Sequence, residues 1–306
     1  MDPIIQVLTD SPSLFVALAG VYSLLVGSFL NVVIYRLPVM MQRDWDDEVN
    51  DYLKQARESD DSRQANVPGN TGESDTAEET FNLVVPRSRC GHCGAAVKAW
   101  QNIPVVSYLL LRGRCANCGT GISWRYPAIE LLTACIAMLI AWQFQTHLVA
   151  AVAAIFFAYA LIALFWIDFD TYLLPDSITL PLLWAGLLVN AFGLFTDLQS
   201  AVFGAAAGYL ILWSVFWLFK LVTGKDGMGY GDFKLLAALG AWLGWQYLPV
   251  IIVLSSLVGA ILGVAMILLA GRDQAKPIPF GPYLATAGLL ALLWGDAINE
   301  FYLATL

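Results

Sequence analysis

Eight apolar runs, separated by polar segments, dominate the pattern of hydrophobic and polar positions along the chain. Most of these runs reach the roughly 20 residues that an α-helix needs to cross the hydrocarbon core of a bilayer, and the sixth is shorter, at about thirteen apolar residues. The pattern predicts an all-α polytopic membrane protein with about eight transmembrane helices. They are expected near residues 13–35, 127–144, 148–167, 178–195, 201–221, 233–245, 249–270 and 282–303.

The first run contains no charged residue and is followed by Arg36, Leu37 and Pro38. A secretory signal peptide carries its positive charge before the apolar run, so this order favours a transmembrane helix instead. Pro38 is expected to end the helix because proline has no amide hydrogen and its ring clashes with the preceding turn. The chain therefore divides into a first transmembrane helix in residues 1–37, an extramembrane domain in residues 38–125 and a seven-helix membrane core in residues 126–306.

Composition agrees with membrane insertion and locates the charge. Hydrophobic residues make up 58% of the 306 residues and charged residues 13%, a balance that soluble domains do not have. The net charge of −8 comes from residues 44–80, which hold twelve of the 24 acidic residues and three of the 16 basic ones. We expect this acidic segment to be a solvated, disordered insertion that serves as a linker. The basic residues do not cluster or alternate with aromatic ones, which argues against a nucleic-acid partner.

The basic residues also predict the orientation of the chain. In the eight-helix arrangement all 16 lysine and arginine residues fall on one side of the membrane, eleven of them from Arg36 to Arg125. The loops on the other side, residues 143–147, 196–200 and 244–248, contain none. Because lysine and arginine accumulate in cytoplasmic loops, the large domain is expected to be cytoplasmic.

Four cysteines in this domain form two C-x2-C pairs, Cys90 with Cys93 and Cys115 with Cys118. Such pairs are typical of a tetrahedral zinc site, because each tight turn brings two thiolates to one metal ion. Two disulfides are the alternative, which a reducing cytoplasm disfavours. Four thiolates leave no open coordination position, so the expected zinc is structural and holds a small zinc-ribbon-like domain together. The fifth cysteine, Cys135, is expected to be a small core residue.

Two aspartates lie where an apolar run meets a polar loop, Asp168 at the end of the third helix and Asp232 at the start of the sixth. Both positions open to the predicted cytoplasmic side, so the two residues are expected to meet at similar depth. An ionisable residue in a membrane helix is costly and is a functional candidate by default. Gly229 and Gly231 precede the second aspartate, where they let the backbone approach a substrate or adopt a positive φ.

Two carboxylates that meet in a poorly solvated pocket cannot both ionise cheaply, so they share one proton. The ionised member can activate water, and the protonated member can polarise a carbonyl and protonate the leaving amine, which is the chemistry of an aspartic peptidase. The same acids suit the ion path of a transporter, and the residues alone leave both functions open. Asp176 is expected to be the N-cap of the fourth helix, and Asp170 is expected to be solvated in the loop. The alternative is that Asp168, Asp170 and Asp176 together coordinate a hard cation.

Two polar residues, Asn31 and Glu130, fall inside the first two predicted helices, near their cytoplasmic ends. Polar side chains in membrane helices commonly hydrogen-bond to neighbouring helices. We expect this role for both residues, and the lining of a substrate groove is the alternative.

Several distinctive blocks of residues are spread along the whole chain, outside the acidic segment. They are Gly27-Ser28-Phe29-Leu30-Asn31-Val32-Val33-Ile34-Tyr35-Arg36-Leu37-Pro38, the two cysteine pairs, Leu111-Arg112-Gly113-Arg114-Cys115, Arg125-Tyr126-Pro127, residues 167–176, residues 229–234 and Pro279-Phe280-Gly281-Pro282-Tyr283. In this order the blocks resemble the bacterial type IV prepilin peptidases, also called prepilin leader peptidase/N-methyltransferases.

The resemblance implies a multi-pass inner-membrane aspartic endopeptidase of the Gly-x-Gly-Asp type, with Asp168 and Asp232 as the catalytic pair. Such enzymes cut the basic leader from type IV prepilins and type II secretion pseudopilins just after a glycine. Bifunctional members then methylate the new N-terminal residue with S-adenosylmethionine, and the cysteine domain favours that type here. The resemblance assigns no residue of this chain to methyl-donor binding. A non-catalytic pilus assembly factor is a further alternative.

Overall fold

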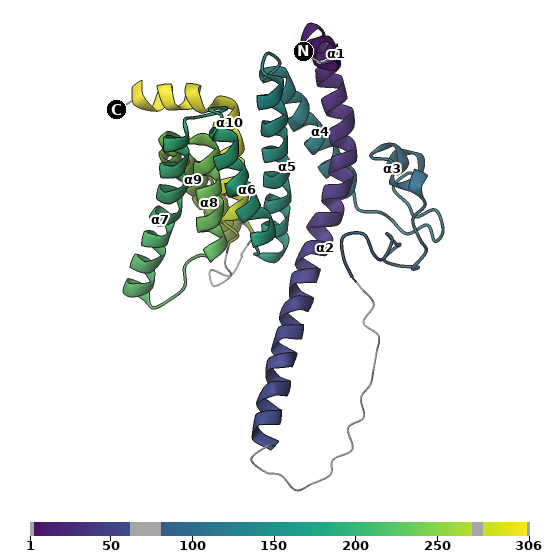
Figure 1. Ribbon diagram of the computed structural model, residues 1–306. Coiled ribbons are helices and arrows are strands. Elements are labelled where there is room, and N and C mark those ends of the chain that lie inside the picture. Colours follow the sequence, from purple (N-terminus) through teal and green to yellow (C-terminus); the bar gives the residue numbers. More distant parts are fainter. Residues whose placement is uncertain (1–2, 62–80, 271–277, 305–306) are drawn as a thin grey trace.

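The structure, a computed structural model, describes residues 3–61, 81–270 and 278–304, and its regular elements within these ranges are all helices (Figure 1). The eight longest helices correspond one to one to the eight predicted runs. They are α2 (Pro12–Asp61), α4 (Arg125–Gln143), α5 (Leu148–Thr171), α6 (Asp176–Asn190), α7 (Leu198–Thr223), α8 (Tyr230–Leu243), α9 (Leu248–Ala270) and α10 (Gly281–Ala304). Four short helices complete the set: α1 (Pro3–Asp10), η1 (Ala99–Asn102), α3 (Val106–Leu110) and η2 (Trp245–Tyr247).

Five helical segments within the described ranges are long and apolar enough to cross a membrane. They are Pro12–Ala56, Arg125–Gln143, Leu148–Thr171, Leu198–Thr223 and Trp245–Met266. Two of the remaining helices, α6 and α8, are apolar but have only 15 and 14 residues, and α10 is broken by non-helical dihedral angles at Trp294. The chain is a multi-pass membrane protein in which short helices are packed among longer ones.

Pro38 lies inside α2, so the expectation that it ends the first helix is wrong. Figure 1 shows that the second half of this 50-residue helix extends well beyond the bundle. An internal proline costs a helix about 3 kcal/mol but removes a single backbone hydrogen bond, so the helix can continue where the residues on both sides favour it. Residues 44–61 of the acidic segment are accordingly helical and not disordered, and residues 62–80 lie outside the described part.

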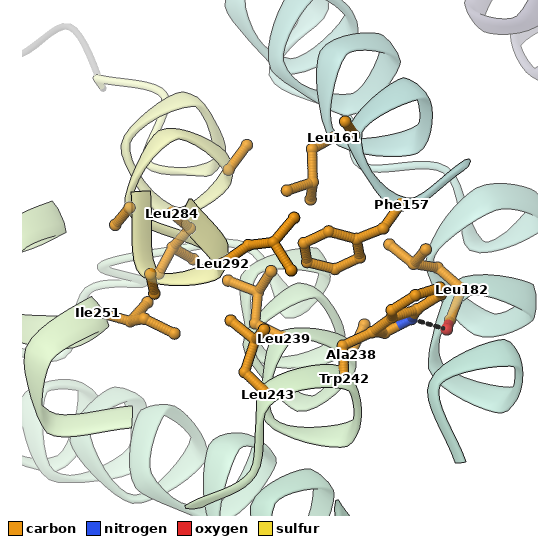
Figure 2. Close-up of a cluster of buried hydrophobic side chains, with 14 of the residues drawn as sticks. Phe157, Leu161, Leu182, Ala238, Leu239, Trp242, Leu243, Ile251, Leu284 and Leu292 are labelled. Carbon is orange, nitrogen blue, oxygen red and sulfur yellow. Dashed lines mark hydrogen bonds between the residues drawn. The ribbon is translucent and has the colours of Figure 1, made fainter. Parts of the chain in front are cut away.

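The core of the bundle forms around α8, which is buried along nearly its whole length from Phe233 to Leu243. A helix that is apolar on every face is typical of a bundle interior. Figure 2 shows Trp242 of α8 between Phe157 of α5 and Leu182 of α6. The indole N–H of Trp242 donates a hydrogen bond to the Leu182 carbonyl (2.7 Å), and its ring centroid lies 4.7 Å from that of Phe157. This packing fixes α8 relative to the helices on both sides.

Trp242→Ala is expected to destabilise the bundle by about 3–5 kcal/mol, the usual cost of removing a large aromatic side chain from a packed core. The substitution would also leave the Leu182 carbonyl without its indole partner. The melting temperature in detergent is expected to fall clearly. The matched control is Trp184→Ala on α6, because that side chain is 64% exposed and its loss creates no cavity. Equal melting temperatures for the two variants would contradict this account of the core.

Glycines allow α7 and α8 to approach closely where they cross. A Cβ atom on Gly204 would overlap the Gly240 carbonyl oxygen, and a Cβ atom on Gly240 would overlap that of Gly204. One turn further along α7, a Cβ atom on Gly208 would lie 2.6 Å from the Leu236 carbonyl oxygen. Small residues four positions apart are a common means of helix association in membranes, where close van der Waals packing replaces the hydrophobic effect.

The two ends of the bundle differ in charge. At one end, which we call the charged end, Arg36 donates hydrogen bonds to the carbonyls of Asn82 and Pro86, and Arg125 and Lys234 form ion pairs. At the opposite end Asn190 donates hydrogen bonds to the carbonyls at the end of α8, and no lysine or arginine occurs there in the described ranges. This distribution matches the one-sided pattern expected from the sequence; Arg63, Arg272 and Lys276 lie outside the described residues.

Candidate active site

Asp168 lies in the last turn of α5, at the charged end, and only 5% of the residue is exposed. Its Oδ2 atom accepts a hydrogen bond from the backbone N–H of Gly281, the first residue of α10 (2.9 Å). The first N–H groups of a helix have no partner within the helix, so they readily bind an anionic group. This hydrogen bond fixes the orientation of the Asp168 carboxylate.

Asp232 lies in the first turn of α8 and is also buried, with 6% of the residue exposed. The backbone of Gly229, which precedes the helix, hydrogen-bonds to its carboxylate, and this carboxylate interacts electrostatically with Asp168. The structure therefore brings together two acids that are far apart in the sequence, at the depth that the helix order predicts. Two carboxylates that are buried close to each other cannot both carry a charge cheaply, so such a pair is suited to holding one proton between its members.

Leu174, in the loop between α5 and α6, packs into the space beside both aspartates. A Cβ atom on Gly231 would lie 2.6 Å from the Cβ atom of Leu174, and one on Gly281 would lie 3.1 Å from its Cδ2 atom. Gly231 thus allows Leu174 to pack closely against α8, and the expected approach of a substrate to this glycine stays a prediction. The alternative expectation of a positive φ is wrong, because Gly229 has a φ of −82° and Gly231 lies within α8.

Two ion pairs flank the aspartates and correct two expectations. Asp170 is exposed, as expected, but it lies in the last turn of α5 rather than in a loop, and it accepts two hydrogen bonds from the Arg125 guanidinium (2.9 and 2.5 Å). Asp176 is the first residue of α6 and not its cap; its carboxylate binds the Lys234 ammonium (2.7 Å to each oxygen). Neither ion pair could be predicted from the sequence, because the basic partner of each aspartate lies on another helix. The pairs tie α4 to α5 and α6 to α8 around the site.

Asn31 and Glu130 satisfy backbone groups of neighbouring segments, as the main expectation stated. The Asn31 amide donates to the carbonyls of Gly27 and Tyr126 (3.2 Å each). Glu130, which is buried in α4, accepts a hydrogen bond from the backbone N–H of Val105 (2.8 Å) and one from the Ser28 side chain. Glu130 therefore links the cysteine domain to the membrane helices.

The four paired cysteines meet at one point, with their sulfur atoms within 4.8 Å of one another: Cys90, Cys93, Cys115 and Cys118. Isolated β-bridges, Arg89 with Ala96 and Arg114 with Gly121, close the two turns that carry them. Hydrogen bonds from Thr120 lower the pKa of the Cys118 thiol to about 6, which favours the thiolate form that metals bind. Four converging sulfur atoms fit a tetrahedral zinc ion.

Two residues depart from the assignments made on the sequence. Cys135 is exposed on α4, so its assignment to the core is wrong. Gly281 is the functional residue that sequence reasoning missed. Gly281-Pro282 directly precedes the last apolar run, and proline is common at the start of a helix, where the first N–H groups have no partner within the helix and can bind a side chain.

Comparison with known proteins assigns the family. The model of the Bacterial Peptidase A24 N-terminal domain matches residues 21–144, and that of the Type IV leader peptidase family matches residues 155–264. A prepilin leader peptidase/N-methyltransferase of Stutzerimonas stutzeri is 52% identical over 303 residues, covering 99% of this chain and 98% of the relative. The chain belongs to the type IV leader peptidase family.

Other members of the family match over nearly their whole length. The prepilin leader peptidase/N-methyltransferases of Aeromonas hydrophila and Pseudomonas aeruginosa are both 52% identical to the chain, with 95% and 98% of each relative covered. No solved structure matched the chain. The first family segment contains α4 and the cysteine cluster, and the second contains both buried aspartates.

Proposed function

We propose that this chain is a membrane aspartic endopeptidase that removes the basic leader of type IV prepilins and type II pseudopilins after a glycine. It then methylates the new N-terminal residue with S-adenosylmethionine as the donor. The observation that carries the proposal is the buried pair of Asp168 and Asp232, oriented by backbone N–H groups at one end of a membrane bundle. Family membership favours this activity over a transporter or a non-catalytic assembly factor.

The proposed reaction uses the single proton shared by the pair. The ionised aspartate accepts a proton from a water molecule as that water attacks the scissile carbonyl carbon. The protonated aspartate hydrogen-bonds to the carbonyl oxygen and then gives its proton to the leaving amine. The Gly281 N–H holds one oxygen of Asp168 in place, so the carboxylate needs little reorganisation during the reaction.

The location of the pair suits this substrate. If the charged end faces the cytoplasm, as the distribution of lysine and arginine predicts, both aspartates lie at the cytoplasmic boundary of an inner membrane. A prepilin with a basic cytoplasmic leader and an apolar membrane helix has its cleavage site at the same boundary. The proposed orientation therefore places the peptide bond and the carboxylates at one depth.

The direct test uses the purified protein in lipid nanodiscs with a prepilin substrate, and measures product masses with and without S-adenosylmethionine. We expect a product that lacks the leader in both samples and a single added methyl group only in the presence of the donor. Uncleaved substrate in both samples would overturn the proposal. Cleavage without methylation would contradict only the proposed methyltransferase activity.

The cysteine cluster is proposed to hold a structural zinc ion, whose thiolate ligands would be Cys90, Cys93, Cys115 and Cys118. We expect about one zinc ion per chain. Cys118→Ser is expected to reduce the metal content severalfold and to make residues 81–124 sensitive to limited proteolysis, because a structural site supplies folding energy to a small domain. Cys135→Ser is the control, since this exposed cysteine is not part of the cluster. Full zinc content in Cys118→Ser would contradict the assignment.

A further inference from the structure

An exposed apolar surface lies on the cysteine domain, away from the candidate active site. It consists of Trp100, Ile103, Val106, Leu109 and Leu110, whose side chains are 47–71% exposed, and we call it the α3 patch. Within α3 (Val106–Leu110) the spacing of three or four residues places Val106, Leu109 and Leu110 on one face of the helix. The sequence has no charged residue between Lys98 and Arg112. An exposed apolar patch of this kind marks an interaction site with a partner or a membrane.

Glu130 determines the depth of the α3 patch. α4 begins at Arg125, and five residues of α-helix place Glu130 about 7.5 Å further from the charged end. Because the Glu130 carboxylate accepts the hydrogen bond from Val105 N–H, α3 starts at this level and not beyond the end of the bundle. Figure 1 shows the same relation, with α3 level with α5, between the two ends of that helix.

The backbone of this segment is suited to an apolar environment, in which an unpaired N–H group costs several kcal/mol. The N–H of Val105 is paired with Glu130, and further hydrogen bonds join Ser107 to Ile103, Leu109 to Val105, Leu111 to Ser107, Gly113 to Tyr108 and Arg114 to Leu111. Val105 itself has a φ of 58°, and a positive φ is rare for a β-branched residue. The unusual backbone conformation of Val105 coincides with the hydrogen bond from its N–H to the Glu130 carboxylate, and strained backbone of this kind often occurs at functional contacts.

We propose that the α3 patch inserts into the bilayer leaflet at the charged end and anchors the cysteine domain to the membrane surface. Interfacial helices bury their apolar face about 5–10 Å below the headgroups, which matches the level set by Glu130. The patch lies beside α4, whose Leu131 is 48% exposed within an apolar membrane helix. Lys98 and Arg112, at the two ends of the uncharged run, are placed to meet anionic headgroups.

The test measures the lipid contact of single positions. A fluorescent non-natural amino acid replaces Leu110 in the full-length protein, which is reconstituted in nanodiscs of phosphatidylethanolamine and phosphatidylglycerol. The controls carry it at Leu131, which faces lipid on α4, or at Tyr52, which is 73% exposed on the part of α2 that extends past the bundle. Lipids brominated in the acyl chains quench from the bilayer, and iodide quenches from water. Zinc content and prepilin cleavage verify that each labelled protein is folded.

We expect brominated lipids to quench position 110 as strongly as position 131, and iodide to quench it much less than position 52. Iodide quenching at position 110 equal to that at position 52 would overturn the proposal. Protection from both quenchers would also overturn it, because a protein surface and not lipid would then cover the α3 patch. Neither outcome bears on the peptidase activity, which the cleavage assay measures separately.

Discussion

Asp168→Asn and Asp232→Asn are each expected to reduce leader cleavage by about 10²–10⁴-fold, the usual contribution of a positioned acid or base. An amide has nearly the same shape as a carboxylate, but it can neither accept the proton of the attacking water nor deliver one to the leaving amine. Because both residues are buried and belong to one pair, the double variant is expected to be no slower than either single variant. Product masses from the nanodisc assay measure the effect.

Asp176→Asn is the matched control for these variants. Asp176 lies at the same end of the bundle, but its side chain is 54% exposed and is paired with Lys234. Ion pairs that reach solvent contribute at most about 1 kcal/mol, so this variant is expected to cleave at nearly the normal rate. If folded Asp168→Asn and Asp232→Asn proteins still cut the substrate, the aspartyl mechanism is wrong. Solute or ion flux that both substitutions abolish, without any cleaved product, would instead support a transporter.

The helices and the meeting of the two aspartates could be predicted from the sequence because both follow from hydrophobicity. An apolar run of sufficient length specifies a membrane helix, and the order of such runs determines which loops share a side. The apolar run that ends at Asp168 and the one that begins at Asp232 meet the same side of the membrane, so the expectation that the two residues lie close together required no knowledge of packing. The cysteine cluster could also be predicted from the sequence, because the spacing within each cysteine pair determines the geometry of the turn that carries it.

The other features depend on contacts between distant segments, which no local pattern records. The partners of Asp170 and Asp176 lie 45 and 58 positions away in the sequence. The continuation of α2 beyond Pro38 was missed because the cost of one proline was given more weight than the many favourable residues around it. Gly281 was recognised as part of a distinctive block, but its role depends on Asp168, 113 positions earlier.

Gly281→Ala is expected to reduce leader cleavage by about 100-fold, although the substitution adds only one methyl group. The new Cβ atom would lie 2.6 Å from Oδ2 of Asp168 and 3.1 Å from Cδ2 of Leu174. The carboxylate would have to rotate away and would lose the hydrogen bond from the Gly281 N–H (2.9 Å). Displacing a reacting group by about 1 Å commonly costs this much in rate, because proton transfer depends on close alignment.

Gly288→Ala separates this effect from general damage to α10. Gly288 lies on the same helix, and a Cβ atom there would come within 2.5 Å of Leu239 in the core, away from both aspartates. We expect Gly288→Ala to lower the melting temperature while the folded protein still cleaves, and Gly281→Ala to show the reverse. Methylation of a substrate that has already lost its leader should continue in Gly281→Ala, because that step does not use the aspartate pair. Parallel loss of cleavage and stability in both variants would mean that Gly281 only packs α10 and does not position Asp168.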